Sequence, residues 1–184
     1  MFEEKKCIEY YEDYPKPEIG PNDALVKTAY CGICGSDIHN FKNQMYQCPL
    51  IMGHELSGEI VELGSAVQGF SKGDRVVGIY VKLDISQGNL GGLGIFQNGG
   101  FAEYVKVPEK YLFHIPEKVS LKDAVMIESF ANITRAMKLS QIGKNERLRV
   151  IGAGNIGKCF LQALLAEKDA EYIIVIELHS FLRK

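Results

Sequence analysis

Residues that can bind a metal ion are concentrated in one part of the sequence. The segment "CGICGSDIH" contains Cys31, Cys34 and His39, and the segment "GHE" that follows it contains His54 and Glu55. Thiolate, imidazole and carboxylate groups are the side chains from which proteins build zinc sites. We therefore expect metal or redox chemistry in this part of the chain, and the spacing leaves three interpretations.

A structural zinc site is the first interpretation, and it needs four protein ligands, commonly with a second cysteine pair. The remaining cysteines are isolated from one another, at Cys7, Cys48 and Cys159. A redox pair is the second, but such a pair belongs at a helix start beside a strand in a thioredoxin-like unit. The third combines Cys34 with His54 and Glu55, which leaves one coordination position open, as a catalytic zinc requires. The residue types favour this third interpretation.

A second group of residues predicts binding of a dinucleotide. Gly152, Gly154 and Gly157 follow a predicted strand and open a predicted helix, which is the context that this glycine pattern requires. The pyrophosphate would then meet free N–H groups at the helix N-terminus. Glu177 ends the next predicted strand, 20 residues after the last glycine, where a carboxylate binds ribose hydroxyls and repels a 2′-phosphate. The pattern favours NAD over NADP; a βαβ turn without a ligand is the alternative.

The elements that would carry these residues fall into two kinds. Residues 1–120 contain short β-rich runs punctuated by turns, at 24–30, 57–63, 74–80 and 101–107, which is typical of a barrel or sandwich. Residues 120–141 predict a helix with Ser120 as its N-cap. A βαβ unit follows, with a largely apolar second strand at 172–177 that we expect to be buried. The glycine-rich run 88–100 predicts a flexible loop. The helix of the βαβ unit places five apolar residues on one face: Ile156, Phe160, Leu161, Leu164 and Leu165.

Composition and charge narrow the class of protein. The chain has 184 residues, 46% of them hydrophobic and 24% charged, with a net charge of −2, which is ordinary for a globular protein. Acidic and basic residues are interspersed, so the sequence predicts no nucleic-acid partner. It has neither a signal-peptide pattern nor an apolar run of the roughly 18 residues that a membrane span needs. We expect a cytoplasmic protein without membrane contact, with reduced cysteines.

Four motifs carry a resemblance to a known family. "GICGSDIH", "MGHELSGEIVELGSAVQGFSKGDRVV", "GGFAEYV" and "GAGNIG" occur in the order seen in zinc-dependent medium-chain alcohol dehydrogenases. The chain most resembles the N-terminal portion of their polyol branch, which includes sorbitol, butanediol and threonine dehydrogenases. The resemblance implies an α/β protein: a GroES-like β-barrel catalytic domain over 1–120, a connecting helical segment over 121–146, and the first βαβ half of a Rossmann NAD-binding domain over 147–184.

The resemblance also implies roles for individual residues. Asp37 matches an acid that orients the ligand histidine, and Ser36 and His39 match a hydroxyl–imidazole proton relay. Metal ligation is implied for four residues: Cys34, His54, Glu55 and Glu128. NAD contacts are implied for five residues: Gly152, Gly154, Ile156, Gly157 and Glu177.

The activity implied is hydride transfer between a secondary alcohol or polyol and NAD, with a small-molecule substrate and one catalytic zinc. A homo-oligomer is compatible with the sequence. No cysteine lies between "GDRVV" and "GGFAEY", so we expect no structural zinc. Arg149 interrupts an otherwise apolar strand and predicts a short or frayed strand there. Two competing functions are a non-catalytic, truncated zinc-binding remnant and a zinc-free protein similar to quinone reductases.

Overall fold

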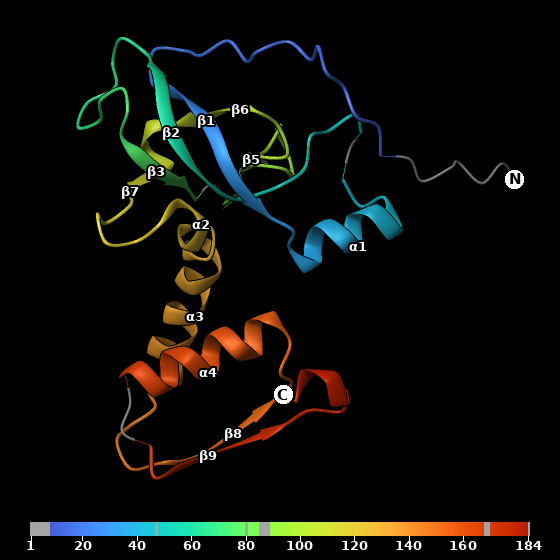
Figure 1. The fold of residues 1–184 in the computed structure, drawn as a ribbon, viewed down its shortest axis with the longest axis vertical. Helices are drawn as coiled ribbons and strands as arrows, with labels where there is room; N and C mark the ends of the chain where they lie inside the picture. Colours follow the sequence, from blue (N-terminus) through green and yellow to red (C-terminus); the bar gives the residue numbers. More distant parts are fainter. Residues whose placement is uncertain (1–7, 47, 80, 85–88, 168–169, 184) are drawn as a thin grey trace, which may run out of the picture. The chain divides into compact units, whose positions relative to one another are not determined.

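The chain forms two compact units, Met1–Glu128 and Ser129–Lys184 (Figure 1). The computed structural model describes residues 8–46, 48–79, 81–84, 89–167 and 170–183. Each unit is described by itself below. The predicted division of the chain at residues 120 and 146 stays a prediction.

An antiparallel sheet of five strands, curled around its core, forms the first unit. Its order is β6-β1-β2-β3-β7, and each neighbouring pair is antiparallel. The strands are β1 (Asp23–Gly32), β2 (Glu55–Leu63), β3 (Arg75–Gly78), β6 (Tyr104–Pro108) and β7 (Leu112–His114). They overlap all four predicted strand regions, although β6 begins three residues later than predicted and residue 80 lies outside the described residues. The predicted β-rich fold of this unit is confirmed.

The core of this unit is built largely from its strands. Three consecutive residues of β1, Ala24, Leu25 and Val26, are each 0% exposed. Ala24 and Val26 belong to the main core cluster and Leu25, between them, does not, which agrees with side chains that alternate between the two faces of a strand. Both faces of β1 are therefore covered here. The main core cluster is Ala24, Val26, Leu56, Ile60, Val76, Leu93, Val105, Val107 and Leu112.

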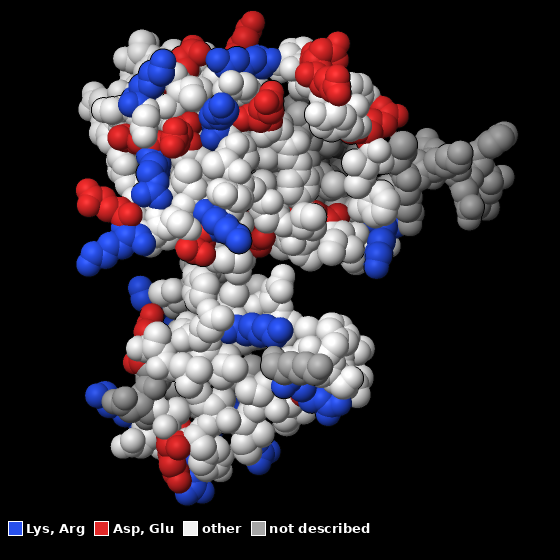
Figure 2. Space-filling view, in the orientation of Figure 1, with Lys and Arg blue, Asp and Glu red and all other residues white. Residues whose placement is uncertain are grey.

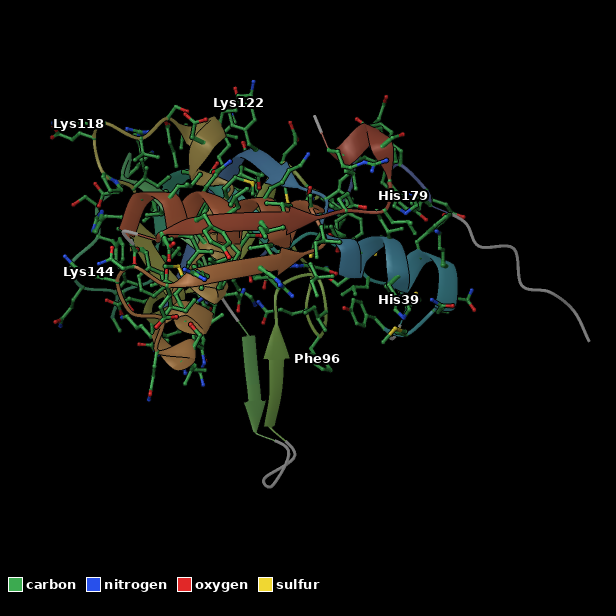
Figure 3. The ribbon with its side chains drawn as sticks, turned by 90° about the horizontal axis from the view of Figure 1, so that it is seen from below. His39, Phe96, Lys118, Lys122, Lys144 and His179 are labelled. Atoms are coloured by element: carbon green, nitrogen blue, oxygen red, sulfur yellow. The ribbon has the colours of Figure 1, made fainter. Side chains whose placement is uncertain are left out.

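The glycine-rich region begins with a strand, so its prediction as a flexible loop is wrong over residues 89–92. β4 (Val81–Asp84) pairs with β5 (Asn89–Gly92) as a two-stranded antiparallel ribbon (Figure 3). The chain then makes a tight turn, in which the N–H of Gly94 donates to the carbonyl of Gln97 over 2.8 Å. Leu93 at this turn is 0% exposed and belongs to the main core. Residue 88 lies outside the described residues.

Helices connect and flank these strands. α1 (Gly35–Asn43) follows β1, and α2 (Leu121–Ala124) and α3 (Ile127–Ser140) follow β7. Ser120 is the N-cap of α2, as predicted, and its hydroxyl accepts from the N–H of Asp123 over 3.0 Å. The single helix expected over residues 120–141 is two helices, because regular α-helix is interrupted between Ala124 and Ile127.

The second unit contains the predicted βαβ arrangement. β8 (Arg147–Ile151) and β9 (Tyr172–Ile176) are parallel, α4 (Asn155–Glu167) connects them, and a short 3₁₀ turn, η3 (Ser180–Leu182), follows. Arg149 does not fray β8, because it is paired with Ile174 in the middle of the strand. Its side chain is exposed, so the guanidinium avoids the burial cost on which the prediction of a short strand rested.

The prediction that β9 is buried is wrong. β9 was expected to be buried, but Ile174, Val175 and Ile176 are 42%, 39% and 50% exposed. The described sheet has two strands, and two strands leave much of their surface uncovered. On α4 the predicted apolar face is divided, since Ile156 and Leu165 are exposed, whereas the residues buried on that helix are Cys159, Ala163 and Leu164.

Charged side chains of both signs are interspersed on the face of the molecule drawn in Figure 2. This distribution agrees with the small net charge of −2. In the described part of the chain, none of the helices is both long and apolar enough to cross a membrane.

Candidate metal centre

The start of α1 is organised by one buried carboxylate. Cys34 is the N-cap of this helix and has extended backbone dihedrals, φ −75° and ψ 156°. Asp37, in the first turn, accepts the Cys34 N–H on Oδ2 over 2.9 Å. A helix leaves its first N–H groups without partners inside the helix, and a carboxylate there also meets the positive end of the helix dipole. Asp37 is 2% exposed, so this cap is shielded from water and fixes the backbone that bears the Cys34 thiol.

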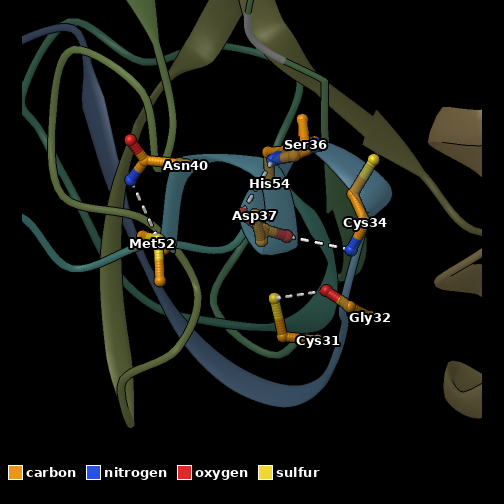
Figure 4. Close-up of polar contacts among 8 residues, drawn as sticks. All are labelled: Cys31, Gly32, Cys34, Ser36, Asp37, Asn40, Met52 and His54. Atoms are coloured by element: carbon orange, nitrogen blue, oxygen red, sulfur yellow. Dashed lines mark hydrogen bonds and ion pairs between the residues drawn. The ribbon is translucent and has the colours of Figure 1, made fainter. Parts of the chain in front are cut away.

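The other oxygen of Asp37 faces His54. Asp37 Oδ1 lies 3.6 Å from His54 Nδ1, while His54 Nε2 lies 3.4 Å from the hydroxyl of Ser36 (Figure 4). Within the described residues, Asp37 Oδ1 and His54 Nδ1 are both buried without a hydrogen-bond partner. Buried polar atoms are normally paired. A proton on Nδ1 directed at the carboxylate leaves the lone pair of the imidazole on Nε2.

The chain reaches His54 through a backbone conformation that only glycine adopts readily. Gly53 has φ +95°, and a Cβ there would lie 2.7 Å from the ring of Phe101 and 2.8 Å from the Cys31 sulfur. Three backbone hydrogen bonds, each 2.8–3.0 Å long, join residues 99–101 to residues 51–53. The segment that precedes His54 is therefore held in one position, by a part of the chain that the sequence pattern did not connect with the site.

Glu55 begins β2 and is 8% exposed. A Cβ on Gly32 would come within 2.5 Å of Glu55 Oε2, so the carboxylate lies against the end of β1. Burial raises the pKa of the Cys31 thiol to about 12, with further contributions from the charges of Asp37 and Glu55. Cys31 is therefore a neutral thiol near pH 7, and its Sγ donates to the carbonyl of Gly32 over 3.8 Å. A metal ligand must be a thiolate, which makes Cys31 the poorer of the two cysteines for that role.

The other predicted site residues differ in how far they are exposed. Cys34 is half-buried, and in Figure 4 its thiol extends away from the imidazole of His54. His39 is exposed on α1 (Figure 3), where Asn43 Nδ2 lies 3.2 Å from its Nδ1. Glu128 is half-buried in the first turn of α3. Across the described ranges, no three His, Cys, Asp or Glu side chains are grouped so as to hold a metal ion as they stand. Cys7 lies outside the described residues.

The chemistry of these groups fits a divalent zinc ion. Asp37 anchors the backbone of Cys34 by a hydrogen bond and faces the imidazole of His54. Such a carboxylate–histidine pair is the support that metal-bound histidines receive from their surroundings. A thiolate from Cys34 and Nε2 of His54 are ligand types that zinc prefers, and a carboxylate from Glu55 is a third. Asp37 Oδ1 and His54 Nδ1 have no other hydrogen-bond partner among the described residues, so each is available to the other.

The glycine turn of the second unit brings the start of α4 and the end of β9 close to the end of β8. Gly152 has φ +95°, and a Cβ on Gly157 would lie 2.0 Å from the Gly152 carbonyl, so helix and turn are in close contact. Glu177 accepts from the Ala153 N–H over 2.6 Å and from the His179 N–H over 2.7 Å. These two hydrogen bonds, first that from Ala153, lower the pKa of Glu177. The carboxylate is therefore ionised and fixed at the end of β9.

Sequence reasoning missed two contributors to the candidate site. One is the segment of residues 99–101, which holds residues 51–53; its motif was noted, but not its contact with "MGHE". The other is Asn40, which is 6% exposed and bonds to Met52, two residues before His54. A signal for Asn40 was present, since it lies three residues after Asp37 and so shares a helix face with it.

A β-rich unit that carries Cys34, Asp37 and His54, followed by a βαβ unit with a glycine turn, is the arrangement that the resemblance in the sequence implies. Residues 20–117 match the model of the alcohol dehydrogenase GroES-like domain family. The chain belongs to this family of zinc-dependent medium-chain alcohol dehydrogenases and to its polyol branch.

Named relatives agree with this assignment. The chain is 35% identical to (R,R)-butanediol dehydrogenase of Bacillus subtilis, over 93% of this chain and 54% of that protein. The crystal structure of galactitol-1-phosphate dehydrogenase from Escherichia coli is 31% identical, with a TM-score of 0.84 over 92% of this chain and 53% of that one. A zinc-binding dehydrogenase from Sinorhizobium meliloti, bound to NADP, is 34% identical, with a TM-score of 0.81 over 91% and 52%. The chain thus spans about half the length of these relatives.

Proposed function

We propose that this chain is the catalytic part of a zinc- and NAD-dependent dehydrogenase that oxidises a secondary alcohol or polyol. The observation that carries the proposal is the position of Asp37, whose two oxygens face the backbone of Cys34 and the imidazole of His54. One buried carboxylate thereby orients two zinc-ligand types from separate segments of the chain.

We assign the zinc to Cys34 and His54, with Glu55 beside them and Glu128 as a further direct or water-bridged ligand. Zinc bound by these residues supplies a Lewis acid that lowers the pKa of an alcohol. Asp37 keeps the proton of His54 on Nδ1, so that Nε2 is free to ligate. This set contains one cysteine and corresponds to one catalytic zinc.

Ser36 is the proposed first acceptor of the substrate proton. Its hydroxyl lies 3.4 Å from His54 Nε2, next to the proposed ligand atom, and a hydroxyl both accepts and donates a proton. His39 lies further along α1 and is exposed, so it can release a proton to water. We propose that Ser36 and His39 form the relay, with the hydroxyl in direct contact with the substrate.

NAD is the proposed cofactor, and Gly152, Gly154, Ile156 and Gly157 are its proposed contacts, together with Glu177. The ionised Glu177 carboxylate lies beside the glycine turn, where it can bind ribose hydroxyls and repels the 2′-phosphate of NADP. The exposed side chain of Ile156, at 57%, is available to pack against the cofactor.

Zinc content and turnover of the purified chain test the proposal together. We expect one zinc per chain, and NADH formation with a diol or polyol substrate when NAD is supplied. Cys34→Ala should lose both the zinc and the turnover. Cys48→Ala, which removes an exposed cysteine, is the matched control and should keep both.

The outcomes separate the competing functions. Zinc without turnover would support a non-catalytic zinc-binding protein. Protein that holds no zinc after growth and dialysis with zinc, yet reduces quinones, would support the zinc-free reductase. Full activity in Cys34→Ala would refute the proposed ligand set.

A further inference from the structure

The buried face of α1 is polar, which is unusual for a helix packed against a protein interior. The buried residues of this helix are Asp37 and Asn40. They follow Cys34 at intervals of three residues, so the three positions lie along one side of the helix. Asp37 already has a role in the candidate metal centre. Asn40, 6% exposed, needs an explanation of its own, because a buried carboxamide is costly unless its groups are bonded.

Both ends of the Asn40 carboxamide are used. Its Oδ1 accepts from the backbone N–H of Tyr46 over 2.7 Å, and its Nδ2 donates to the sulfur of Met52 over 3.3 Å (Figure 4). The N–H of Tyr46 can only donate, so it fixes which end of the amide is oxygen. The side chain therefore has one orientation, and it ties α1 both to the turn that follows it and to the segment that leads to His54.

These bonds do more than end the helix. The backbone carbonyl of Asn40 already accepts from the N–H of Gln44 over 2.7 Å, and Gln44 has the left-handed conformation, φ 49°, that closes a helix. The hydrogen bond from Asn40 to Met52 is not part of this helix cap, because it reaches a segment 12 residues away. Asp37 faces residue 54 and Asn40 contacts residue 52, so α1 meets the same segment at two points.

Two points of contact fix the rotation of a segment as well as its distance. We infer that Asn40 is a positioning residue: through Met52 and Tyr46 it holds the segment of His54 in register with the helix of Cys34, so that thiolate and imidazole can share one zinc ion. This inference rests on the proposed function, since it assumes that Cys34 and His54 bind zinc. Residues 99–101 hold residues 51–53 by backbone hydrogen bonds, and Asn40 adds a side-chain hydrogen bond from α1 to the same segment.

Asn40→Leu tests the inference, because leucine has the same branching at Cγ and removes both the donor and the acceptor. Asn43→Leu is the matched control, since Asn43 is on the same helix but exposed, where its amide bonds to His39. Zinc affinity is measured by competition with a chromophoric chelator. We expect Asn40→Leu to bind zinc about 10- to 100-fold more weakly, the usual effect of losing an outer support of a metal site, and Asn43→Leu to stay within about twofold of wild type.

The absorption spectrum of the cobalt-substituted protein separates positioning from mere stabilisation. At saturating Co²⁺, Asn40→Leu should shift the ligand-field bands, because the geometry of the ligands changes. A residue that only stabilised the fold would lower the urea midpoint and leave that spectrum unaltered, and this result would overturn the inference. If Asn40→Leu does not fold, Met52→Leu decides, since it removes only the sulfur acceptor; unchanged affinity and spectrum in that variant would also overturn the inference.

The same experiment distinguishes failure of the inference from failure of the proposed function. Wild-type protein without a thiolate-to-cobalt charge-transfer band would refute the proposed function. A normal wild-type band, together with unchanged affinity and spectrum in Asn40→Leu, would refute the inference alone.

Discussion

Asp37→Asn changes the group on which the proposed zinc site depends, without changing its size. An asparagine has one oxygen, and the Cys34 N–H, now 2.9 Å from Oδ2, requires an acceptor. The amide oxygen therefore takes the position of Oδ2, and the amide nitrogen takes that of Oδ1, which lies 3.6 Å from His54 Nδ1. An amide nitrogen donates, so Nδ1 becomes an acceptor and the imidazole proton moves to Nε2. A protonated Nε2 has no lone pair for zinc.

Moving the His54 proton from Nδ1 to Nε2 removes the support that the Asp37 carboxylate gives to the imidazole. Removing such a support weakens metal binding by about 10- to 100-fold, which is about 1.4–2.8 kcal/mol at 1.4 kcal/mol for each tenfold change. Competition with a chromophoric zinc chelator measures the change directly, and a urea titration of the metal-free protein checks that the fold is intact.

Asp74→Asn is a closely matched control. Asp74 Oδ2 accepts from the N–H of Ser71, three residues earlier, over 2.7 Å and lies 3.8 Å from Nδ1 of His114. As at Asp37, one aspartate accepts a backbone N–H from three residues earlier and faces a histidine. Here a single oxygen makes both contacts, the histidine is exposed, and Ser71 occupies the position that corresponds to Cys34. We expect Asp74→Asn to leave zinc affinity unchanged. Equal zinc affinities for wild type and Asp37→Asn, with the fold intact, would refute the reasoning.

Three further predictions concern single groups. Gly53→Ala should destabilise the fold by about 1–3 kcal/mol more than Gly69→Ala in urea unfolding, because both glycines have positive φ but only Gly53 is crowded; equal losses would show that the contacts of Gly53 are unimportant. Iodoacetamide at pH 8 should label the exposed Cys48 and spare Cys31, whose pKa of about 12 leaves only about 10⁻⁴ of it as thiolate; comparable labelling would contradict that pKa. The pKa of the Glu177 carboxyl, followed by NMR, should lie below the ordinary value of about 4.3, since backbone donors favour its charged form. Its contribution to stability is then present above that ordinary value and is lost as the pH falls through the lower folded pKa. A measured pKa at or above 4.3 would contradict this.

Much of the fold could be predicted because local signals agreed with the tertiary structure. Ser120 before a helix and glycines after a strand are signals that act over a few residues. Ser120 caps α2 as predicted, and Gly152 has the positive φ of a tight turn. The prediction of a frayed strand at Arg149 is wrong for a physical reason. It assumed that the guanidinium would be buried, and the Arg149 side chain is exposed. Whether an apolar strand is covered depends on neighbours that a local pattern does not contain.

The candidate site was predictable in its residue types and not in its supports. Cys34 and His54 are visible as ligand types, and Asp37 was assigned to the imidazole that it faces. Its second function, capping the helix at Cys34, follows from structure that the motif alone does not specify. The contact of Asn40 with Met52 could not be predicted, because it depends on how a loop of irregular structure folds back on α1.

The most direct test of the proposed zinc site is X-ray absorption at the zinc edge of the purified protein. Ligation by Cys34, His54 and carboxylate predicts one sulfur at about 2.3 Å and the remaining ligands as nitrogen or oxygen at about 2.0–2.2 Å. Cys34→Ser should remove the sulfur signal. Four sulfur ligands, or a bound zinc with none, would contradict the account.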